Sequence, residues 1–189
     1  MPKLKKETEI IHIDEPTELT QKRAHWEIFL DYGPYLVIII VVIIIRTFIA
    51  TPIRVNGASM DPTLVNGEMM VLNKLVVRTR GIERWDIVVV RVDNSNLIKR
   101  VIGLPGETIK YENGNLYING QQKEDLFSLT TTYDFAERLI GPNEYFVMGD
   151  NRNISQDSRS EQIGNVSKSD IRGRTNIIIF PIGRFGRVD

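Results

Sequence analysis

A run of fourteen uncharged residues, Tyr32 to Ile45, constrains this chain more than any other feature. At a rise of about 1.5 Å per residue, a helix over this run is shorter than the roughly 30 Å apolar core of a bilayer. Continuing the helix to Ile53 makes it long enough, because the guanidinium of Arg46 can reach the headgroups while its stem stays in lipid. The sequence therefore predicts one membrane-spanning helix over residues 32–53.

Two other interpretations of the apolar run fit less well. A buried strand of this length would exceed the usual range of roughly 3 to 10 residues. A cleavable signal peptide could end near small residues such as Ala50, but it would not follow a mixed-charge segment of some thirty residues. We therefore expect an uncleaved anchor after a polar tail over residues 1–31. Basic residues occur on both flanks of the anchor and leave its orientation open.

The distribution of histidine and cysteine excludes several kinds of hydrolase. Cysteine is absent, and both histidines, His12 and His25, precede the apolar run. Residues 26–189 therefore offer no thiol or imidazole for a Ser-His-Asp triad or a zinc site. The 24 basic residues balance the 24 acidic ones, which argues against nucleic acid as a partner. We expect no metal and no cofactor.

Beyond Arg54 the pattern changes to short runs of Val, Ile and aromatic residues bounded by Gly, Asn, Asp or Pro, which is typical of a mostly β domain over residues 54–189. Asn113-Gly114 predicts a type I′ hairpin turn. Residues 119–143 are more polar, and we expect a short cap-like excursion with a helix at Asp134 to Leu139. The expected strands are Met69 to Val77, Asp86 to Val92, Leu97 to Ile102, Thr108 to Tyr111, Asn115 to Ile118, Glu144 to Met148 and Asn176 to Phe180.

Ser59 is a candidate nucleophile in a segment rich in turn residues. Gly57 lets a backbone pass close to Ser59, and Pro62 limits the following turn, so that a substrate carbonyl could reach both the hydroxyl and the amide of the serine. A serine in a Gly/Pro loop is more often a simple turn residue. This segment alone therefore does not define an active site.

The base for such a serine would have to be a lysine, since no other neutralisable nitrogen remains. Lys99 has the most apolar sequence neighbours, because it lies within Leu97 to Ile102. Lysines in such runs more often lie at a sheet edge or extend to water. If Lys99 is buried, desolvation lowers its pKa from about 10.4 toward about 8, which would make it a usable general base.

A third cluster, residues 149–159, follows the apolar run Tyr145 to Met148 and fits a tight polar loop. In the functional interpretation, Ser155 hydrogen-bonds the lysine amine and holds it toward Ser59. In the structural interpretation, one of two ion pairs pins the loop. These pairs are Asp157 with Arg159, or Asp150 with Arg152.

The segments form four boxes in a fixed order just downstream of the anchor. The boxes are Gly57-Ala-Ser-Met-Asp-Pro-Thr-Leu64, Arg84-Trp-Asp-Ile-Val-Val89, Lys99-Arg-Val-Ile-Gly-Leu-Pro-Gly106 and Gly149-Asp-Asn-Arg followed by Asn153-Ile-Ser-Gln-Asp-Ser-Arg159. In this pattern the chain resembles the bacterial type I signal peptidases, or leader peptidases, in their short Gram-positive-like form with a Ser/Lys dyad. The resemblance covers about residues 33 to 182, and the four boxes are specific in combination.

The resemblance implies a role for each matching residue. Ser59 would be the nucleophile, Lys99 the general base and Ser155 the residue that orients Lys99, while Asp157 and Arg159 would support the loop. Some members carry a serine, which donates to the oxyanion, at the position that Gly57 occupies here. The Ser59 amide remains as one oxyanion donor, and the second donor stays open.

The resemblance also implies a fold, a location and a substrate. The fold is an antiparallel β catalytic domain outside the membrane, with the tail in the cytoplasm and membrane lipid as a partner. The substrates are secretory preproteins, cut after small residues at the first and third positions before the bond (Ala-X-Ala-like). They would pair with Pro52 to Asn56 and Asn96 to Ile98, so that Val55 and Ile98 line the pockets.

Two rival functions remain to be separated from this one. A non-catalytic, signal-peptidase-like assembly or binding protein would be expected to lack Ser59 or Lys99, and this chain has both. A self-cleaving repressor-type Ser/Lys peptidase would be soluble and carry a DNA-binding domain, which the apolar run and the balanced charge argue against.

Overall fold

The computed structural model describes residues 18–128, 130 and 132–188. The chain divides into two compact units, one up to Ile43 and one from Ile44 onward. Residues 1–17 of the expected tail lie outside the described residues, whereas residues 18–31 of it belong to a helix.

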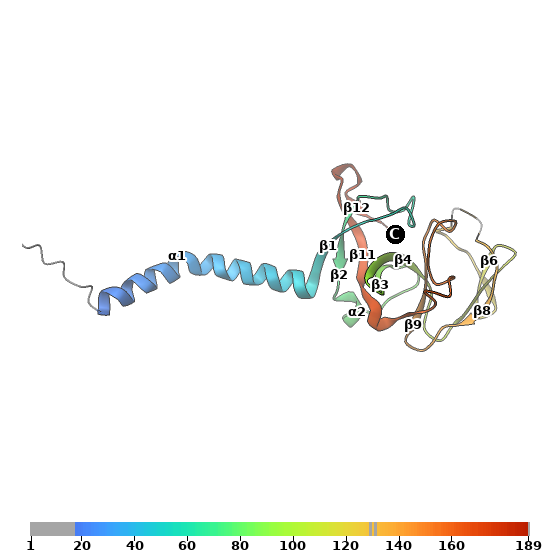
Figure 1. Ribbon diagram of the computed structural model, residues 1–189, viewed down its shortest axis with the longest axis horizontal. Coiled ribbons are helices and arrows are strands. Elements are labelled where there is room, and N and C mark those ends of the chain that lie inside the picture. Colours follow the sequence, from blue (N-terminus) through green and yellow to red (C-terminus); the bar gives the residue numbers. More distant parts are fainter. Residues whose placement is uncertain (1–17, 129, 131, 189) are drawn as a thin grey trace, which may run out of the picture. The chain divides into compact units, whose positions relative to one another are not determined.

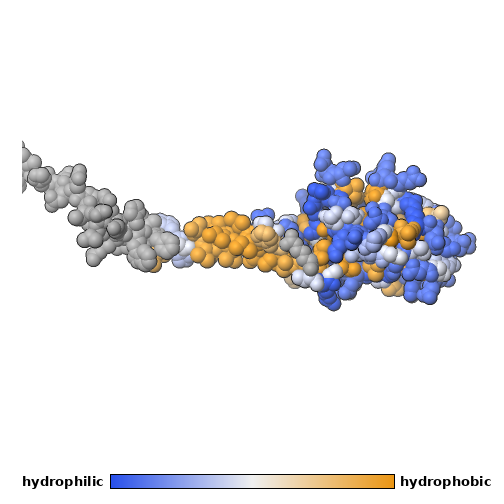
Figure 2. All heavy atoms as spheres, turned by 90° about the horizontal axis from the view of Figure 1, so that it is seen from below, coloured by the Kyte–Doolittle hydropathy of each residue, from blue (hydrophilic) through white to orange (hydrophobic). Residues whose placement is uncertain are grey.

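The helix α1 (Glu18–Ile44) continues as a π-helical segment, Ile45–Ile49. By length and composition, Leu30–Ile49 is the one stretch of the described residues that is long and apolar enough to cross a membrane. Its large apolar side chains are exposed, as the face seen in Figure 2 shows. Residues 50–53 of the expected span lie in a strand, because the extended strand β1 begins at Ala50.

The unit from Ile44 onward is a mostly β domain made of two antiparallel sheets (Figure 1). The larger sheet has the order β1-β2-β11-β3-β4-β9-β10, with β12 paired to β11. Its strands are β1 (Ala50–Arg54), β2 (Met69–Asn73), β3 (Ile87–Val92), β4 (Ser95–Gly103), β9 (Glu144–Met148), β10 (Val166–Ser167), β11 (Ile171–Phe180) and β12 (Gly186–Arg187). The predicted fold class, a mostly β antiparallel domain after one apolar helix, is confirmed.

The smaller sheet has the order β7-β6-β5-β8. Its strands are β5 (Thr108–Glu112), β6 (Asn115–Ile118), β7 (Gln121–Lys123) and β8 (Phe135–Leu139). The predicted hairpin is confirmed, because Asn113 and Gly114 have φ values of 51° and 74° between the paired strands β5 and β6. The expected excursion, residues 119–143, contributes β7 and β8 to this sheet.

The predicted helix at Asp134 to Leu139 is wrong, because this segment forms β8. Phe135 stacks on Phe146 and lies against Tyr111, each with ring centroids 5.5 Å apart, and β8 pairs with β5. These contacts with the rest of the domain outweigh the local helical preference.

The predicted strand Met69 to Val77 is too long. It ends at Asn73, whose side-chain oxygen accepts hydrogen bonds from the amides of Leu75 and Val76 and so favours the short helix α2 (Val76–Thr79). The other short helical turns are Lys168–Asp170 and Ile182–Arg184.

The core explains why the central strands are continuous apolar runs. Ile87 to Val90 of β3 are all buried, because Val88 and Val90 pack into one apolar cluster and Ile87 into another. A third cluster fills the space around the smaller sheet with Ile109, Leu116 and Phe146. The result is a packed framework that carries Lys99 on β4 and from which the loops with Ser59 and residues 149–159 extend.

Two strand edges remain open next to the candidate site. Among the described residues, β1 pairs only with β2, so its outer edge is free. In β4, residues 95–99 pair with β3 alone, because pairing with β9 begins at Arg100. Free edges of this kind can accept an extended peptide.

Candidate active site

Ser59 lies in the loop between β1 and β2, and its two apolar neighbours fix the loop. Met60 and Leu64 are completely buried in the cluster that contains Val55. The backbone of Val55 closes the base of the loop by bonding to Glu68 and Gly67 at 2.8 and 2.9 Å. The serine is therefore held at the surface of the core rather than on a mobile turn.

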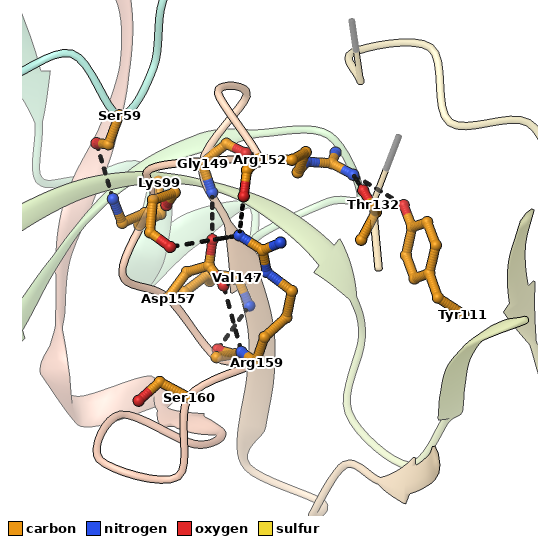
Figure 3. Close-up of polar contacts among 12 residues, drawn as sticks. Ser59, Lys99, Tyr111, Thr132, Val147, Gly149, Arg152, Asp157, Arg159 and Ser160 are labelled. Atoms are coloured by element: carbon orange, nitrogen blue, oxygen red, sulfur yellow. Dashed lines mark hydrogen bonds and ion pairs between the residues drawn. The ribbon is translucent and has the colours of Figure 1, made fainter. Parts of the chain in front are cut away.

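Lys99 contacts Ser59 directly. Its Nζ lies 2.8 Å from the Ser59 Oγ (Figure 3), and the lysine is only 3% exposed. Burial lowers the pKa of Lys99 to about 8, an effect that Asp157 opposes and Arg159 supports. The lysine is therefore neutral in a substantial fraction of molecules at mildly alkaline pH.

Loop 149–159 is held by a buried ion pair within it. Arg159 donates two hydrogen bonds to Asp157, at 2.8 and 2.9 Å, and Asp157 accepts a further one from the amide of Gly149 at 3.1 Å (Figure 3). The guanidinium of Arg159 also donates to the backbone carbonyls of Arg152 and Ser155. One of the two ion pairs expected from the sequence is thus present.

The other expected pair, Asp150 with Arg152, is not formed. Asp150 instead accepts two hydrogen bonds from Arg100, at 2.9 and 2.8 Å, and both groups are buried. Arg152 pairs with Asp125, which lies in the excursion, and also donates to Tyr111 and Thr132. Two further buried ion pairs therefore tie the loop to β4 and to the segment after β7.

Sequence reasoning missed Arg100 and Asp125. Arg100 follows Lys99 in the same apolar run, and this position could have predicted a second buried cation. Asp125 is one of several acidic residues in a polar segment, and nothing in the sequence separates it from its neighbours.

Ser155 lies beside Gly149, on the same side of the loop as the Ser59 backbone. A methyl group on Gly149 would overlap both the Ser155 Oγ and the Ser59 carbonyl oxygen. The Ser155 Oγ is buried and makes no hydrogen bond within the described residues, so the expected bond to Lys99 is not formed in this structure. Its orienting role stays a prediction.

A groove leads away from Ser59 between the two free strand edges. A small cavity of about 60 Å³ beside the serine is lined by Val55 and Ile98, the two predicted pocket residues, together with Lys99. A larger hollow of about 600 Å³ shares Ile98 with it and continues to Thr51. The small volume next to Ser59 suits a small side chain.

The amide of Ser59 has no partner among the described residues. It donates no hydrogen bond within the described part of the chain, whereas the nearby Gly57 amide donates to the side chain of Asn66 at 3.0 Å. Of these two amides, that of Ser59 is therefore the one left unpaired within the described residues.

The comparisons with known proteins identify the family of this chain. The family described as signal peptidase, peptidase S26, matches residues 29–180. The chain belongs to this family. The resemblance inferred from the sequence is thus confirmed, and the family is one of peptidases.

Several signal peptidases are similar to this chain. Signal peptidase I P of Bacillus subtilis subsp. natto is 40% identical over 162 residues, covering 79% of this chain and 87% of that protein. Signal peptidase I S of Bacillus subtilis (strain 168) is 37% identical over 174 residues, covering 85% of this chain and 94% of that protein. A crystal structure of a signal peptidase I from Enterococcus faecalis matches with a TM-score of 0.44 and 31% identity, covering 49% of this chain and 95% of that chain.

Proposed function

We propose that this chain is a membrane-anchored serine endopeptidase that removes signal peptides from secretory preproteins. In this proposal Ser59 is the nucleophile and Lys99 the general base. The observation that carries it is the 2.8 Å contact between the Lys99 Nζ and the Ser59 Oγ, made by a lysine whose burial lowers its pKa to about 8. A lysine with an ordinary pKa would be almost entirely protonated at neutral pH and could not accept the proton.

The reaction follows from the dyad. The neutral Lys99 amine accepts the hydroxyl proton of Ser59 as the Oγ attacks the carbonyl carbon of the scissile peptide bond. The oxyanion that forms accepts a hydrogen bond from the Ser59 amide. The Lys99 ammonium then donates its proton to the departing amine, which leaves an ester on Ser59. The neutral Lys99 amine then accepts a proton from water, which attacks the ester, and the resulting ammonium returns this proton to the departing Ser59 Oγ.

The substrate preference is proposed from the groove. An extended peptide lying between β1 and residues 95–99 of β4 can pair with both free edges. The small cavity lined by Val55 and Ile98 would accept small side chains such as alanine before the cut. In the proposed topology, Leu30–Ile49 spans the membrane, with the N-terminus in the cytoplasm and the β domain outside.

The test uses the full-length chain in detergent with a preprotein as substrate. Ser59→Ala and Lys99→Ala should each abolish cleavage, and the double variant should be no worse, because nucleophile and base act as one unit. The matched controls Ser128→Ala and Lys123→Ala, both beside the smaller sheet and away from the dyad, should keep activity. Near-normal cleavage by Lys99→Ala would remove the lysine from the mechanism.

A further variant tests Ser155 as a positioning residue. Ser155→Ala should cost roughly 10- to 1000-fold in kcat, since it would misorient the base without removing it. Ser155→Thr, which keeps the hydroxyl, should recover part of the loss. Equal kinetics for wild type and Ser155→Ala would exclude the orienting role.

A further inference from the structure

A second hollow, of about 740 Å³, lies away from Ser59 among the end of β2, the helix α2 and the start of β11. α2 packs against β11, so this part of the domain is continuous (Figure 1). The hollow is lined by three cationic side chains, those of Lys74, Lys168 and Arg172, and by no carboxylate. Its lining therefore carries a local positive charge in a chain whose net charge is zero.

The three cations have no acidic partner among the described residues, unlike nine other basic residues of the domain. Within the described residues, none of them lies within 4.0 Å of a carboxylate. Basic residues that do have such a partner are Arg80, Arg84, Arg91, Arg100, Lys110, Arg152, Arg159, Arg174 and Arg184. Unpaired cations gathered around a hollow are suited to bind an anion.

Two hydroxyl groups complete the lining. The Oγ atoms of Ser167 and Ser169 lie 2.9 Å apart and both line the hollow. Hydroxyls together with ammonium and guanidinium groups are the usual side-chain donors to phosphate oxygens. The polar and cationic groups of the lining therefore fit a phosphate group better than an apolar ligand.

The position of Lys74 indicates where that phosphate comes from. Its Nζ donates to the carbonyls of Arg46 and Thr47, at 3.0 and 3.2 Å, and its amide donates to the carbonyl of Ile49 at 3.0 Å. These residues end the apolar segment Leu30–Ile49. If that segment spans the bilayer, as proposed above, its end lies at the level of the headgroups, and so does this side of the hollow.

We propose that the hollow lined by Lys74, Lys168 and Arg172 binds the phosphate headgroup of an anionic phospholipid. The site adjoins the far end of the Ser59 groove, with which it shares Lys74 and Arg172, and it contains neither Ser59 nor Lys99. Bound lipid would hold the membrane-proximal end of the β domain against the bilayer surface through β2 and β11, the two strands that also neighbour each other in the larger sheet.

The experiment measures lipid binding to the full-length protein in neutral detergent by native mass spectrometry. Phosphatidylglycerol and phosphatidylcholine with the same acyl chains are compared. The variant Lys168→Gln/Arg172→Gln is matched by Lys110→Gln/Lys123→Gln, which changes the net charge equally but on the smaller sheet. Each cation near an anionic headgroup raises the binding affinity about fivefold. The first double variant should therefore bind phosphatidylglycerol at least about tenfold more weakly.

The control double variant should bind phosphatidylglycerol as the wild type does, and Ser59→Ala should also bind it normally. Normal lipid binding by Ser59→Ala would show that the lipid site does not depend on catalysis by the proposed dyad. Equal losses in both double variants would mean that only overall charge matters, and no loss in either would exclude the hollow; both results overturn the proposal. Displacement of the lipid by millimolar inorganic phosphate would reassign the site to a soluble phosphate.

Discussion

The Ser59–Lys99 region and loop 149–159 both bury cations, but they treat the charge in opposite ways. Lys99 is buried against a neutral hydroxyl, and its pKa falls to about 8. Burial also acts to lower the pKa of Arg152, but its bonds to Asp125 and Tyr111 overcome that effect, and the pKa is raised above its usual value. Burial without an acidic partner favours the neutral amine of Lys99, whereas an acidic partner keeps the buried Arg152 charged.

The two regions are adjacent, since Lys99 and Arg100 are consecutive residues of β4. The carboxylate of Asp150 goes to Arg100 and that of Asp157 goes to Arg159, so neither pairs with Lys99. A free carboxylate beside the lysine would keep it protonated. Arg100 of β4 and Arg159 of the loop thus keep the neighbouring carboxylates from pairing with Lys99.

The largest expected effect comes from removing one partner of a buried pair. Arg152→Met should lower the free energy of unfolding by about 3 to 5 kcal/mol, because it leaves the Asp125 carboxylate buried without its partner. Thermal or chemical unfolding in detergent measures the change. Arg91→Met, which breaks the more exposed pair with Asp170, should cost about 1 kcal/mol or less. Equal costs would show that burial does not distinguish the two pairs.

The free energy of unfolding should change in the opposite direction when Lys99, which has no acidic partner within the described residues, is replaced. Lys99→Met should raise the free energy of unfolding at pH 7 by up to about 3 kcal/mol, while abolishing activity. The folded pKa, about 8, lies below the unfolded value of 10.5, so the penalty is complete below pH 8 and disappears as the pH rises to 10.5. Unfolding measured across this range should show the difference between variant and wild type closing. A constant difference would contradict the lowered pKa.

A smaller effect tests how the loop influences the lysine. Activity should rise with pH through about 8, the pKa of Lys99. Arg159→Gln should move this rise in activity to higher pH, because it exposes Lys99 to the charge of Asp157. Asp157→Asn should move the rise to lower pH. Shifts of up to about one pH unit are expected. Arg80→Gln, in an exposed pair, should not change the pH at which activity rises. If no loop variant changes that pH, a group other than Lys99 titrates.

The smallest effect should come from reagents directed at metals and thiols. The chain contains no cysteine, and both histidines precede the β domain, so chelators and thiol-alkylating reagents should leave cleavage unchanged. Initial rates with and without each reagent measure this. Strong inhibition by a chelator would point to a base other than Lys99.

Much of the framework could be predicted from local patterns. The Val- and Ile-rich runs gave the strands, and Asn113-Gly114 gave the hairpin, because both depend on a few neighbouring residues. The failure at β8 has the opposite cause. Phe135 lies in that strand through contacts with Tyr111 and Phe146, which a local pattern does not contain.

The candidate site divides in the same way. Ser59 and Lys99 could be singled out, because eliminating histidine and cysteine left few nucleophiles and bases. The partner of Asp150 could not be assigned, because Arg152 is nearer to it in the sequence than Arg100, and yet Asp150 pairs with Arg100 of β4. Pairing between distant segments is a property of the folded sheet, not of the segment.

The close contact at Gly149 has a consequence for how such sequences can be recombined. The Asn151 amide donates to the Ser59 carbonyl at 3.1 Å, and the space beside Gly149 is filled by Ser155 and the Ser59 backbone. Segments 57–64 and 149–159 therefore form one module, although they are far apart in the chain. A chimera that exchanges only one of them with a relative would misalign this contact, whereas one that exchanges both would transfer it intact.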